Sequence, residues 1–328
     1  MIIAQTPYRI SLFGGGTDFE DYYKLYGGEV IGTTINKYCY VTLRDLPPFF
    51  KHKHRFIWSK IENVNNLNQI KHPLVKSTLK YFKFNKGLEV HYDGDLPGNS
   101  GIGSSSSFCV GLINAIYSKK KTKITKKKLS DLSYHIENKI MKEYVGRQDQ
   151  TWAAYGGFNH IAFSKKGIHV SKILTNENLK KKLFDNLLIF FTGKSRYSNK
   201  IEKDKQLNLR KKIEIYHKIK KQVKTSTEII KNGKNINDIG YLLDEYWSLK
   251  KQLSNLVSPN NINEIYKVAK SAGALGGKLI GSGGSGFFMF YCDKNKQKKL
   301  INTLNKLQRV HFKSTDYGSR IIFNNEKN

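Results

Sequence analysis

The chain has 328 residues, too many for one ordinary hydrophobic core, and fits two domains or one large α/β unit. It carries a formal net charge of +31, yet only 8 of its 57 basic residues are Arg. A dedicated nucleic-acid surface more often uses Arg and interleaves aromatic residues, so the lysines indicate solvated faces and no specific nucleic-acid partner. A positive field of this size also favours the collection of anionic small molecules.

The sequence shows no sign of a membrane segment or of a secreted protein. It has no run of about 18 apolar residues, and residues 1–7 lack the basic start and the cleavage site of a signal peptide. Cys39, Cys109 and Cys292 lie far apart in apolar runs and form no Cys-x-x-Cys pair, so we expect buried free thiols. We therefore expect a cytoplasmic protein without membrane contact.

The first half of the chain contains patterns of both strands and helices. Residues 35–43 alternate in the period of a half-buried strand, and residues 108–117 are apolar on all sides, as in a buried helix. Apolar side chains recur at every third or fourth position over 127–145, which predicts an amphipathic helix. The predicted elements are strands over 2–13, 35–43, 88–92 and 158–163 and helices over 108–117 and 127–145.

The composition changes near residue 175, where a polar, lysine-rich stretch precedes a fully apolar strand. We place a domain boundary there, which gives domains of residues 1–175 and 176–328. Asn232 and Gly233 separate two long helical patterns, and Gly273 suits the C-cap of a third helix. The predicted elements of this half are strands over 187–192, 287–292 and 320–323 and helices over 207–231, 238–256, 263–272 and 297–307.

A glycine- and serine-rich segment at residues 95–107 follows a predicted strand and opens a predicted helix. Its glycines let backbone N–H groups turn inward around an anion, and the helix N-terminus adds the positive end of its dipole. Its four consecutive serines can cap the helix, bind phosphate oxygens or ligate Mg²⁺. The segment lacks the Lys-[Ser/Thr] ending of a Walker A loop and the glycine spacing of a dinucleotide site. Taken alone, it could also be a flexible loop with an N-cap.

Two further segments are rich in glycine. Residues 6–18 form a predicted strand that carries Arg9, followed by three glycines and Asp18. Such an arginine can stabilise charge on a transferring phosphoryl group, and such an aspartate can accept hydrogen bonds from sugar hydroxyls, although an edge-strand Arg and a capping Asp would explain both. Residues 276–287 let the backbone approach a ligand or another loop closely, or form a tight helix-to-strand connection.

In this order and spacing, the three segments resemble the signature motifs of the GHMP kinase superfamily, which includes galactokinase and the homoserine, mevalonate and phosphomevalonate kinases. The resemblance covers residues 6–323. Within the superfamily, residues 14–18, 146–150, 192–196 and the third motif look most like the bacterial D-glycero-D-manno-heptose 7-phosphate kinases.

The resemblance implies an α+β, two-domain GHMP kinase fold. Residues 1–175 would form an ATP-binding domain like ribosomal protein S5 domain 2, and residues 176–328 a ferredoxin-like C-terminal domain, with the active site between them. The implied reaction transfers phosphate from ATP to the anomeric hydroxyl of D-glycero-D-manno-heptose 7-phosphate, giving the 1,7-bisphosphate for nucleotide-activated heptose in capsule or surface polysaccharide synthesis. A fucose- or galactose-type kinase and a non-catalytic sensor are alternatives. The partners would be ATP and a sugar phosphate, and a homodimer is possible.

The resemblance also implies residue roles. Asp149 matches the catalytic aspartate, which accepts or orients the proton of the attacked hydroxyl. Arg9 matches the basic residue of the first motif, and could hold Asp149 ionised or stabilise the transferring phosphoryl group. The residues expected to bind ATP are Pro97, Gly98, Asn99, Ser100, Gly101, Ile102, Gly103, Ser104, Ser105 and Ser106.

A magnesium site is implied by the same resemblance. Ser105 and Glu137 match the family's metal ligands, and one carboxylate with one hydroxyl suffices because Mg²⁺ usually keeps waters and substrate phosphates as ligands. Glu143 is the rival carboxylate, and Ser104 and Ser106 are near enough to be mistaken for Ser105.

The acceptor site is the least determined part of the sequence. Asp18 is the best candidate for recognition of hydroxyl groups. Lys194 and Arg196 follow an apolar strand and could receive a phosphate already on the substrate, although an exposed basic loop would look the same. The residues expected to bind substrate are Gly16, Asp18, Gly193, Lys194, Arg196 and Gly283.

Overall fold

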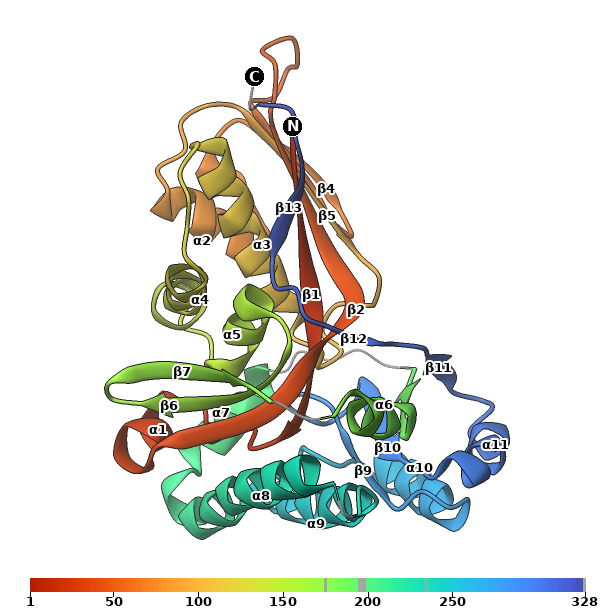
Figure 1. Ribbon diagram of the computed structural model, residues 1–328. Helices are drawn as coiled ribbons and strands as arrows, with labels where there is room; N and C mark the ends of the chain where they lie inside the picture. The colour runs from red at the N-terminus through yellow and green to blue at the C-terminus, as the bar shows by residue number, and fades with distance from the viewer. Residues whose placement is uncertain (174–175, 194–198, 234, 327–328) are drawn as a thin grey trace.

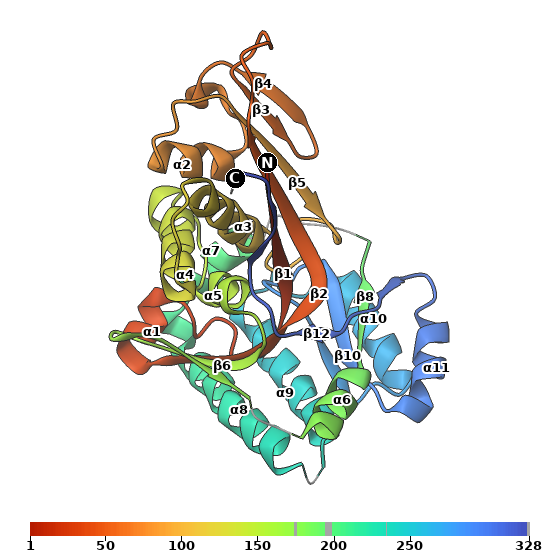
Figure 2. The ribbon, with the colours of Figure 1, turned by 45° about the horizontal axis from the view of Figure 1, so that its top comes forward.

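The computed structural model describes residues 1–173, 176–193, 199–233 and 235–326 (Figure 1). Among these residues, nine strands form one sheet and four strands form another, and helices pack against both (Figures 1 and 2). No helix of the described residues is long and apolar enough to cross a membrane. Cys39, Cys109 and Cys292 are buried free thiols, as predicted.

The first sheet is built around β1 (Ile2–Phe13) and β2 (Gly28–Asp45), which pair antiparallel along most of their length. β2 pairs with β6 in its first part and with β5 in its second, so it begins seven residues before the predicted strand over 35–43. The remaining strands of this sheet are β3 (His54–Ile57), β4 (Ile61–Val64), β5 (Leu88–Gly94), β6 (Phe158–Ser164), β7 (Gly167–Lys172), β12 (Ser314–Thr315) and β13 (Arg320–Asn324).

Helices cover one face of the first sheet. α3 (Ser104–Lys119) packs against β1 and β2, and its apolar residues are buried nearly all round, as the sequence predicts. Figure 1 shows α2, α3, α4 and α5 on the same side of β1. The other helices of this half are α1 (Glu20–Tyr26), η1 (Leu67–Gln69), α2 (Pro73–Tyr81), α4 (Lys126–Tyr134), η2 (His135–Ile140) and α5 (Gln148–Tyr155).

The second sheet is antiparallel, in the order β11-β8-β10-β9. β8 (Leu187–Phe191) and β10 (Phe287–Tyr291) are central and almost wholly buried, which explains their continuous apolar sequences. β9 (Gly276–Leu279) and β11 (Gln308–Val310) flank them. The helices of this half are α6 (Glu177–Asp185), α7 (Asn199–Leu207), η3 (Arg210–Lys212), α8 (Ile213–Asn232), α9 (Asp238–Leu253), α10 (Asn260–Ser271) and α11 (Lys294–Thr303).

The end of the chain returns to the first sheet. β12 pairs with β2, and β13 pairs with β1, from Ile2 to Gln5. Figures 1 and 2 show β13 running beside β1, far from β11. The division of the chain at residue 175 therefore stays a prediction, and the second half contributes two strands to the first sheet.

The predicted continuous helix over 127–145 is wrong. α4 ends at Tyr134, η2 continues as a π-helix to Ile140, and the chain is irregular from there to Arg147. The Met141 N–H bonds the Ile136 carbonyl five residues back, and Lys142 takes a positive φ of 57°, which ends the helix. A π-turn changes the direction of the side chains that follow it, and such turns are common at functional sites.

Helices of the second half also differ from the sequence prediction. α6 was not predicted, because its residues form only a polar, lysine-rich stretch in the sequence. The helix predicted over 207–231 begins at Ile213, because η3 separates α7 from α8. α7 itself was not predicted, since its polar, lysine-rich sequence has few apolar positions.

Candidate active site

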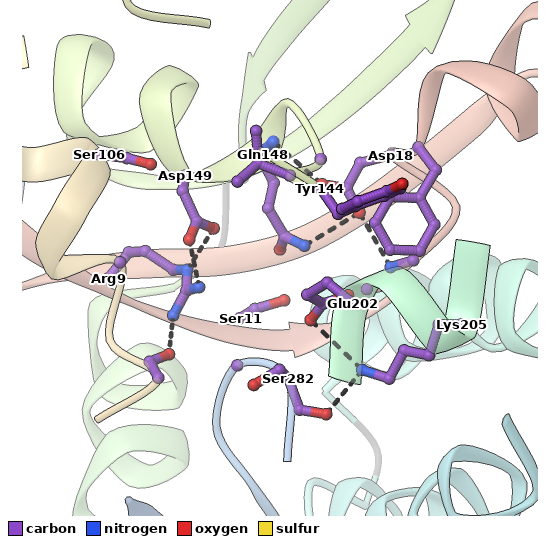
Figure 3. Close-up of a pocket in the computed structure, with 18 of the residues that line it drawn as sticks. Arg9, Ser11, Asp18, Ser106, Tyr144, Gln148, Asp149, Glu202, Lys205 and Ser282 are labelled. Carbon is purple, nitrogen blue, oxygen red and sulfur yellow. Dashed lines mark hydrogen bonds and ion pairs between the residues drawn. The ribbon is translucent and has the colours of Figure 1, made fainter. Parts of the chain in front are cut away.

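A cleft between the two halves gathers the predicted motifs (Figure 3). β1 and its glycine turn, the loop before α3, and the segment from η2 to α5 line it from the first half. α7, α9 and the third glycine-rich segment line it from the second half. The cleft is therefore shared by parts of the chain that are up to about 270 residues apart in sequence.

Arg9 and Asp149 form a two-pronged ion pair in this cleft (Figure 3). Arg9 Nε donates to Asp149 Oδ1 at 2.8 Å, and Arg9 Nη2 donates to Oδ2 at 2.6 Å. The third guanidinium nitrogen donates to the carbonyl of Gly101, so Arg9 also holds the loop before α3. Arg9 is 4% exposed, whereas Asp149 in the first turn of α5 keeps 24% of its side chain exposed. The carboxylate is thus fixed in direction and still accessible.

Asp18 is buried and holds the start of α5 next to the glycine turn. Its carboxylate accepts hydrogen bonds from the Gly16 N–H, the Gln148 N–H and Gln148 Nε2, at 2.9 to 3.1 Å. Burial raises the pKa of Asp18 to about 6, although the hydrogen bond from Gly16 lowers it. Gly146 passes so close that a Cβ there would lie 1.9 Å from Asp18 Oδ2. Asp18 and Gly16 both line the cleft, so contact with a ligand is compatible with this bonding.

Glu137 lies in the π-helical turn and meets the serines of α3. Ser105 Oγ donates to Glu137 Oε1 at 2.8 Å, Ser106 Oγ donates to Oε2 at 2.8 Å, and Gln150 Nε2 donates to Oε2 at 2.6 Å. Burial raises the pKa of Glu137 to about 7, against the lowering effect of these three hydrogen bonds. A buried carboxylate with two hydroxyls is an oxygen-only donor set, which fits the ligand preference of Mg²⁺.

The residues predicted to bind ATP differ in how deeply they are buried. Positive φ angles at Asn99, Gly101 and Gly103 turn the loop into the N-terminus of α3. Ser100 and Ile102 are buried, and Ser100 Oγ donates to the Pro97 carbonyl, so these two residues support the loop. Pro97 and Gly98 are exposed and are not among the residues that line the cleft in the described chain. The members of the predicted set that line the cleft are Asn99, Gly101, Gly103, Ser104, Ser105 and Ser106.

The third glycine-rich segment packs backbone against backbone on this loop. A Cβ at Gly281 would lie 2.5 Å from the Gly101 backbone, and one at Gly286 would lie 2.2 Å from the Ser100 carbonyl. The Phe287 N–H bonds that same carbonyl at 3.3 Å. The glycines therefore let the two halves of the chain meet without side chains between them.

Some predicted substrate residues lie away from the described cleft lining. Gly283 lies against Val257, while Gly281 and Ser282 line the cleft instead. Gly193 is exposed just after β8 and is not among the lining residues of the described chain. Lys194 and Arg196 lie outside the described residues.

Three buried lysines in the cleft wall were not predicted: Lys205, Lys250 and Lys278. Among 49 lysines, most carry no distinguishing signal. Lys250 had one, since it follows Tyr246 and Trp247 on the apolar face of α9. Lys278 had another, because it stands inside the third glycine-rich segment.

Comparisons with known proteins agree with this geometry. Residues 73–157 match the GHMP kinases N terminal domain, and residues 227–309 match the GHMP kinases C terminal domain. D-glycero-alpha-D-manno-heptose 7-phosphate kinase of Campylobacter jejuni is 30% identical over 322 residues, which cover 94% of each chain. Mevalonate kinase of Methanocaldococcus jannaschii is 25% identical over 74% of this chain and 75% of its own.

The fold is also that of a solved structure. A D-glycero-D-manno-heptose 1-phosphate kinase from Bacteroides thetaiotaomicron superposes with a TM-score of 0.78 at 24% identity, over 97% of this chain and 98% of that one. The two-domain GHMP kinase fold expected from the sequence is thereby confirmed. The chain belongs to the GHMP kinases and is an ATP-dependent phosphotransferase that acts on a hydroxyl group, within the sugar kinases of that family.

Proposed function

We propose that the chain phosphorylates the anomeric hydroxyl of D-glycero-D-manno-heptose 7-phosphate and so produces the 1,7-bisphosphate used for nucleotide-activated heptose. The observation that carries the proposal is the match to the heptose 7-phosphate kinase across 94% of both chains. A cleft rich in buried cations suits an acceptor that already carries a phosphate.

Asp149 is the group that faces the acceptor hydroxyl in this proposal. It accepts the hydroxyl proton as the oxygen attacks the γ-phosphorus, and ADP leaves. The two hydrogen bonds from Arg9 fix the carboxylate in one orientation. Of the two roles considered for Arg9, this geometry supports the pairing with Asp149.

The loop before α3 is proposed to hold the triphosphate of ATP. Gly101 and Gly103 bring backbone into the cleft, and the first turn of α3 offers free N–H groups and its dipole. Glu137 and Ser105 would hold Mg²⁺, with Ser106 as a second hydroxyl. Both serines donate hydrogen bonds to Glu137, which favours Glu137 over the rival carboxylate of Glu143. When bound, the ion neutralises charge on the phosphates.

The test is a coupled assay of ADP release with heptose 7-phosphate, galactose, fucose and mevalonate as acceptors. Heptose 7-phosphate should give the highest kcat/KM, and ³¹P NMR of the product should show phosphate at both the anomeric and the seventh position. Preference for galactose or fucose would contradict the heptose proposal while leaving the kinase activity intact.

A further inference from the structure

Three lysines from separate elements place buried ammonium groups in one wall of the cleft. Lys205 lies on α7, Lys250 on α9 and Lys278 on β9, and they are 4%, 4% and 2% exposed. Lys205 Nζ donates to the Ser282 carbonyl at 2.6 Å, and Lys278 Nζ donates to the Leu12 carbonyl at 2.9 Å. Lys250 Nζ donates to the carbonyls of Leu279 and Gly281, at 2.7 and 2.6 Å.

These cations have little compensating negative charge. In the described part of the chain, Lys205 has a carboxylate partner, Glu202 at 3.3 Å, whereas Lys250 and Lys278 form no ion pair. Lys278 faces the ring of Tyr246 at 4.3 Å. Burial lowers the pKa of Lys250 well below its usual value, and Lys278 and Lys205 lower it further. Burial likewise lowers the pKa of Lys278, followed by the charges of Arg9 and Lys205.

Unpaired buried charge is costly, which is why the pKa values of Lys250 and Lys278 fall, and an anionic ligand in contact with them would favour their charged form again. An ammonium group has three N–H donors, and the described hydrogen bonds use fewer than three on each lysine. A phosphate dianion offers both the charge and enough acceptor oxygens for the remaining donors.

The three lysines, called the lysine wall below, belong to the second half of the chain, and of these Lys250 bonds Gly281, which packs on Gly101 of the proposed triphosphate loop. Lys278 bonds the end of β1, directly before the glycine turn that leads to Asp18. In Figure 3, Lys205 and Glu202 lie on the Asp18 side of the pocket, across from Arg9 and Asp149. Ser105 and Glu137, in contrast, belong to the side of α3 and η2.

We propose that the lysine wall is the subsite for the phosphate group that the acceptor already carries. This inference rests on the proposed function for its acceptor class, and it moves the phosphate contact from the predicted Lys194 and Arg196 to buried residues of the second half. The chemistry at this site, a phosphate held by ammonium groups, would also suit the γ-phosphate of ATP, so the experiment must separate the two sources.

The experiment uses Lys205→Met and Lys278→Met, which keep the length of the side chain and remove the charge. Lys212→Met is the matched control, because half-buried Lys212 also donates to a backbone carbonyl, that of Gln252 at 2.6 Å, outside the cleft lining. For each enzyme, KM is measured for heptose 7-phosphate, for the same heptose without phosphate, and for ATP. Arg196→Ala is assayed in parallel, and inorganic phosphate is tested as an inhibitor.

We expect both cleft variants to raise KM for heptose 7-phosphate by roughly 10–100-fold, the scale of a lost hydrogen bond to a charged group. KM for ATP and for the unphosphorylated heptose should stay within about twofold, as should all three constants of Lys212→Met. Inorganic phosphate should compete with heptose 7-phosphate in the parent and lose this effect in the variants. Lys205→Arg and Lys278→Arg, which keep the charge, should retain the preference if a Met variant folds poorly.

A matching rise in KM for ATP would assign the lysine wall to the γ-phosphate and overturn the proposal. So would unchanged constants in the lysine variants, or a loss of heptose 7-phosphate binding confined to Arg196→Ala. If the parent does not prefer the phosphorylated heptose, the proposed function fails. Lysine-dependent inhibition by inorganic phosphate would then still support an anion subsite, and its absence would overturn that too.

Discussion

The carboxylate of Asp149 is oriented by the protein itself, because two nitrogens of Arg9 hold both of its oxygens. In the proposed reaction, such preorganisation would remove the need to reorient a charged group as the acceptor hydroxyl attacks. The same pair joins β1 to α5, two elements that are distant in the sequence.

Asp149→Asn should lower kcat by roughly 10²–10⁴-fold, the usual scale of general-base loss, while ATP still binds. The amide cannot take up the hydroxyl proton. Turnover is measured by ADP release and ATP binding by calorimetry, with Asp45→Asn as control, since Asp45 is also paired with a basic side chain, Lys119, but away from the cleft. Near-parental kcat in a folded Asp149→Asn enzyme would rule out the proposed role.

Glu137 makes the stability of the protein depend on pH. Its folded pKa of about 7 exceeds the ordinary glutamate value of 4.5, because burial disfavours the charged form. The stabilisation from its bound proton is complete below pH 4.5 and is lost as the pH rises through 7. In the absence of metal, the loss amounts to about 3 kcal/mol.

Glu137→Gln should therefore remove this part of the pH dependence. Urea unfolding at pH 4.5 and pH 8 in chelator should show the variant gaining up to about 3 kcal/mol relative to the parent at the higher pH. Mg²⁺ should then stabilise the parent at pH 8 and leave the variant unchanged, as binding to the native state requires. Parallel pH curves for the two proteins, or equal stabilisation by Mg²⁺, would contradict the assignment.

Sequence reasoning located Arg9, Asp149 and Glu137 because each stands at a fixed place in or near a motif. It missed Lys205, Lys250 and Lys278 because burial is what distinguishes them from the other lysines, and burial of one lysine among 49 is set by the tertiary fold. Asp18 was found, but the hydrogen bonds that it accepts from Gln148 could not be foreseen, since they join segments that are 130 residues apart.

At the scale of elements, the junction from η2 to α5 decides where the carboxylates of Glu137 and Asp149 lie. Periodic apolar residues predicted one helix over 127–145, yet periodicity does not show where a helix changes its hydrogen-bonding pattern. The π-turn directs Glu137 toward Ser105 and Ser106, and the irregular chain that follows brings Asp149 to Arg9. Helices and strands with strong apolar patterns, such as α3, β8 and β10, were predicted because packing alone determines them.

Gly146→Ala tests this junction. The new Cβ would overlap Asp18 Oδ2 and push apart the carboxylate and the Gln148 N–H, which shifts the first turn of α5 with Asp149. We expect about 1–3 kcal/mol of destabilisation from overpacking and a fall in kcat of roughly 10²-fold from misplacement. Stability is measured by urea unfolding, with Gly98→Ala as the control for stability, since a Cβ at Gly98 would have nothing within 4 Å. Parental kcat and stability in Gly146→Ala would show that the junction accommodates the added Cβ without displacing Asp149, which would contradict the prediction.

At the scale of the whole molecule, the net charge of +31 does not show which lysines are buried in the cleft, whereas the fold does. The net charge could not show which cations matter, because the lysines are spread along the chain and most are solvated. The central strands of the second sheet were predicted from their local apolar sequence. The pairing of the last strands of the chain with the first sheet was not predicted. β12 has two residues and β13 five, and pairing over 300 residues leaves no local pattern.

This pairing predicts that residues 1–172 do not fold well alone. Without β13, the backbone of Ile2–Gln5 on β1 keeps β2 on one side and loses its antiparallel partner on the other, and an unpaired edge of a hydrophobic sheet favours aggregation. Residues 312–326 fused through a flexible linker ahead of Met1 should restore the pairing, since the Asn325 N–H bonds the Met1 carbonyl at 3.2 Å. The fused fragment should stay monomeric and unfold cooperatively in urea, at a higher midpoint than residues 1–172. Coincident unfolding curves and equal solubility would show that the first sheet is complete without the end of the chain, and would favour the boundary predicted at residue 175.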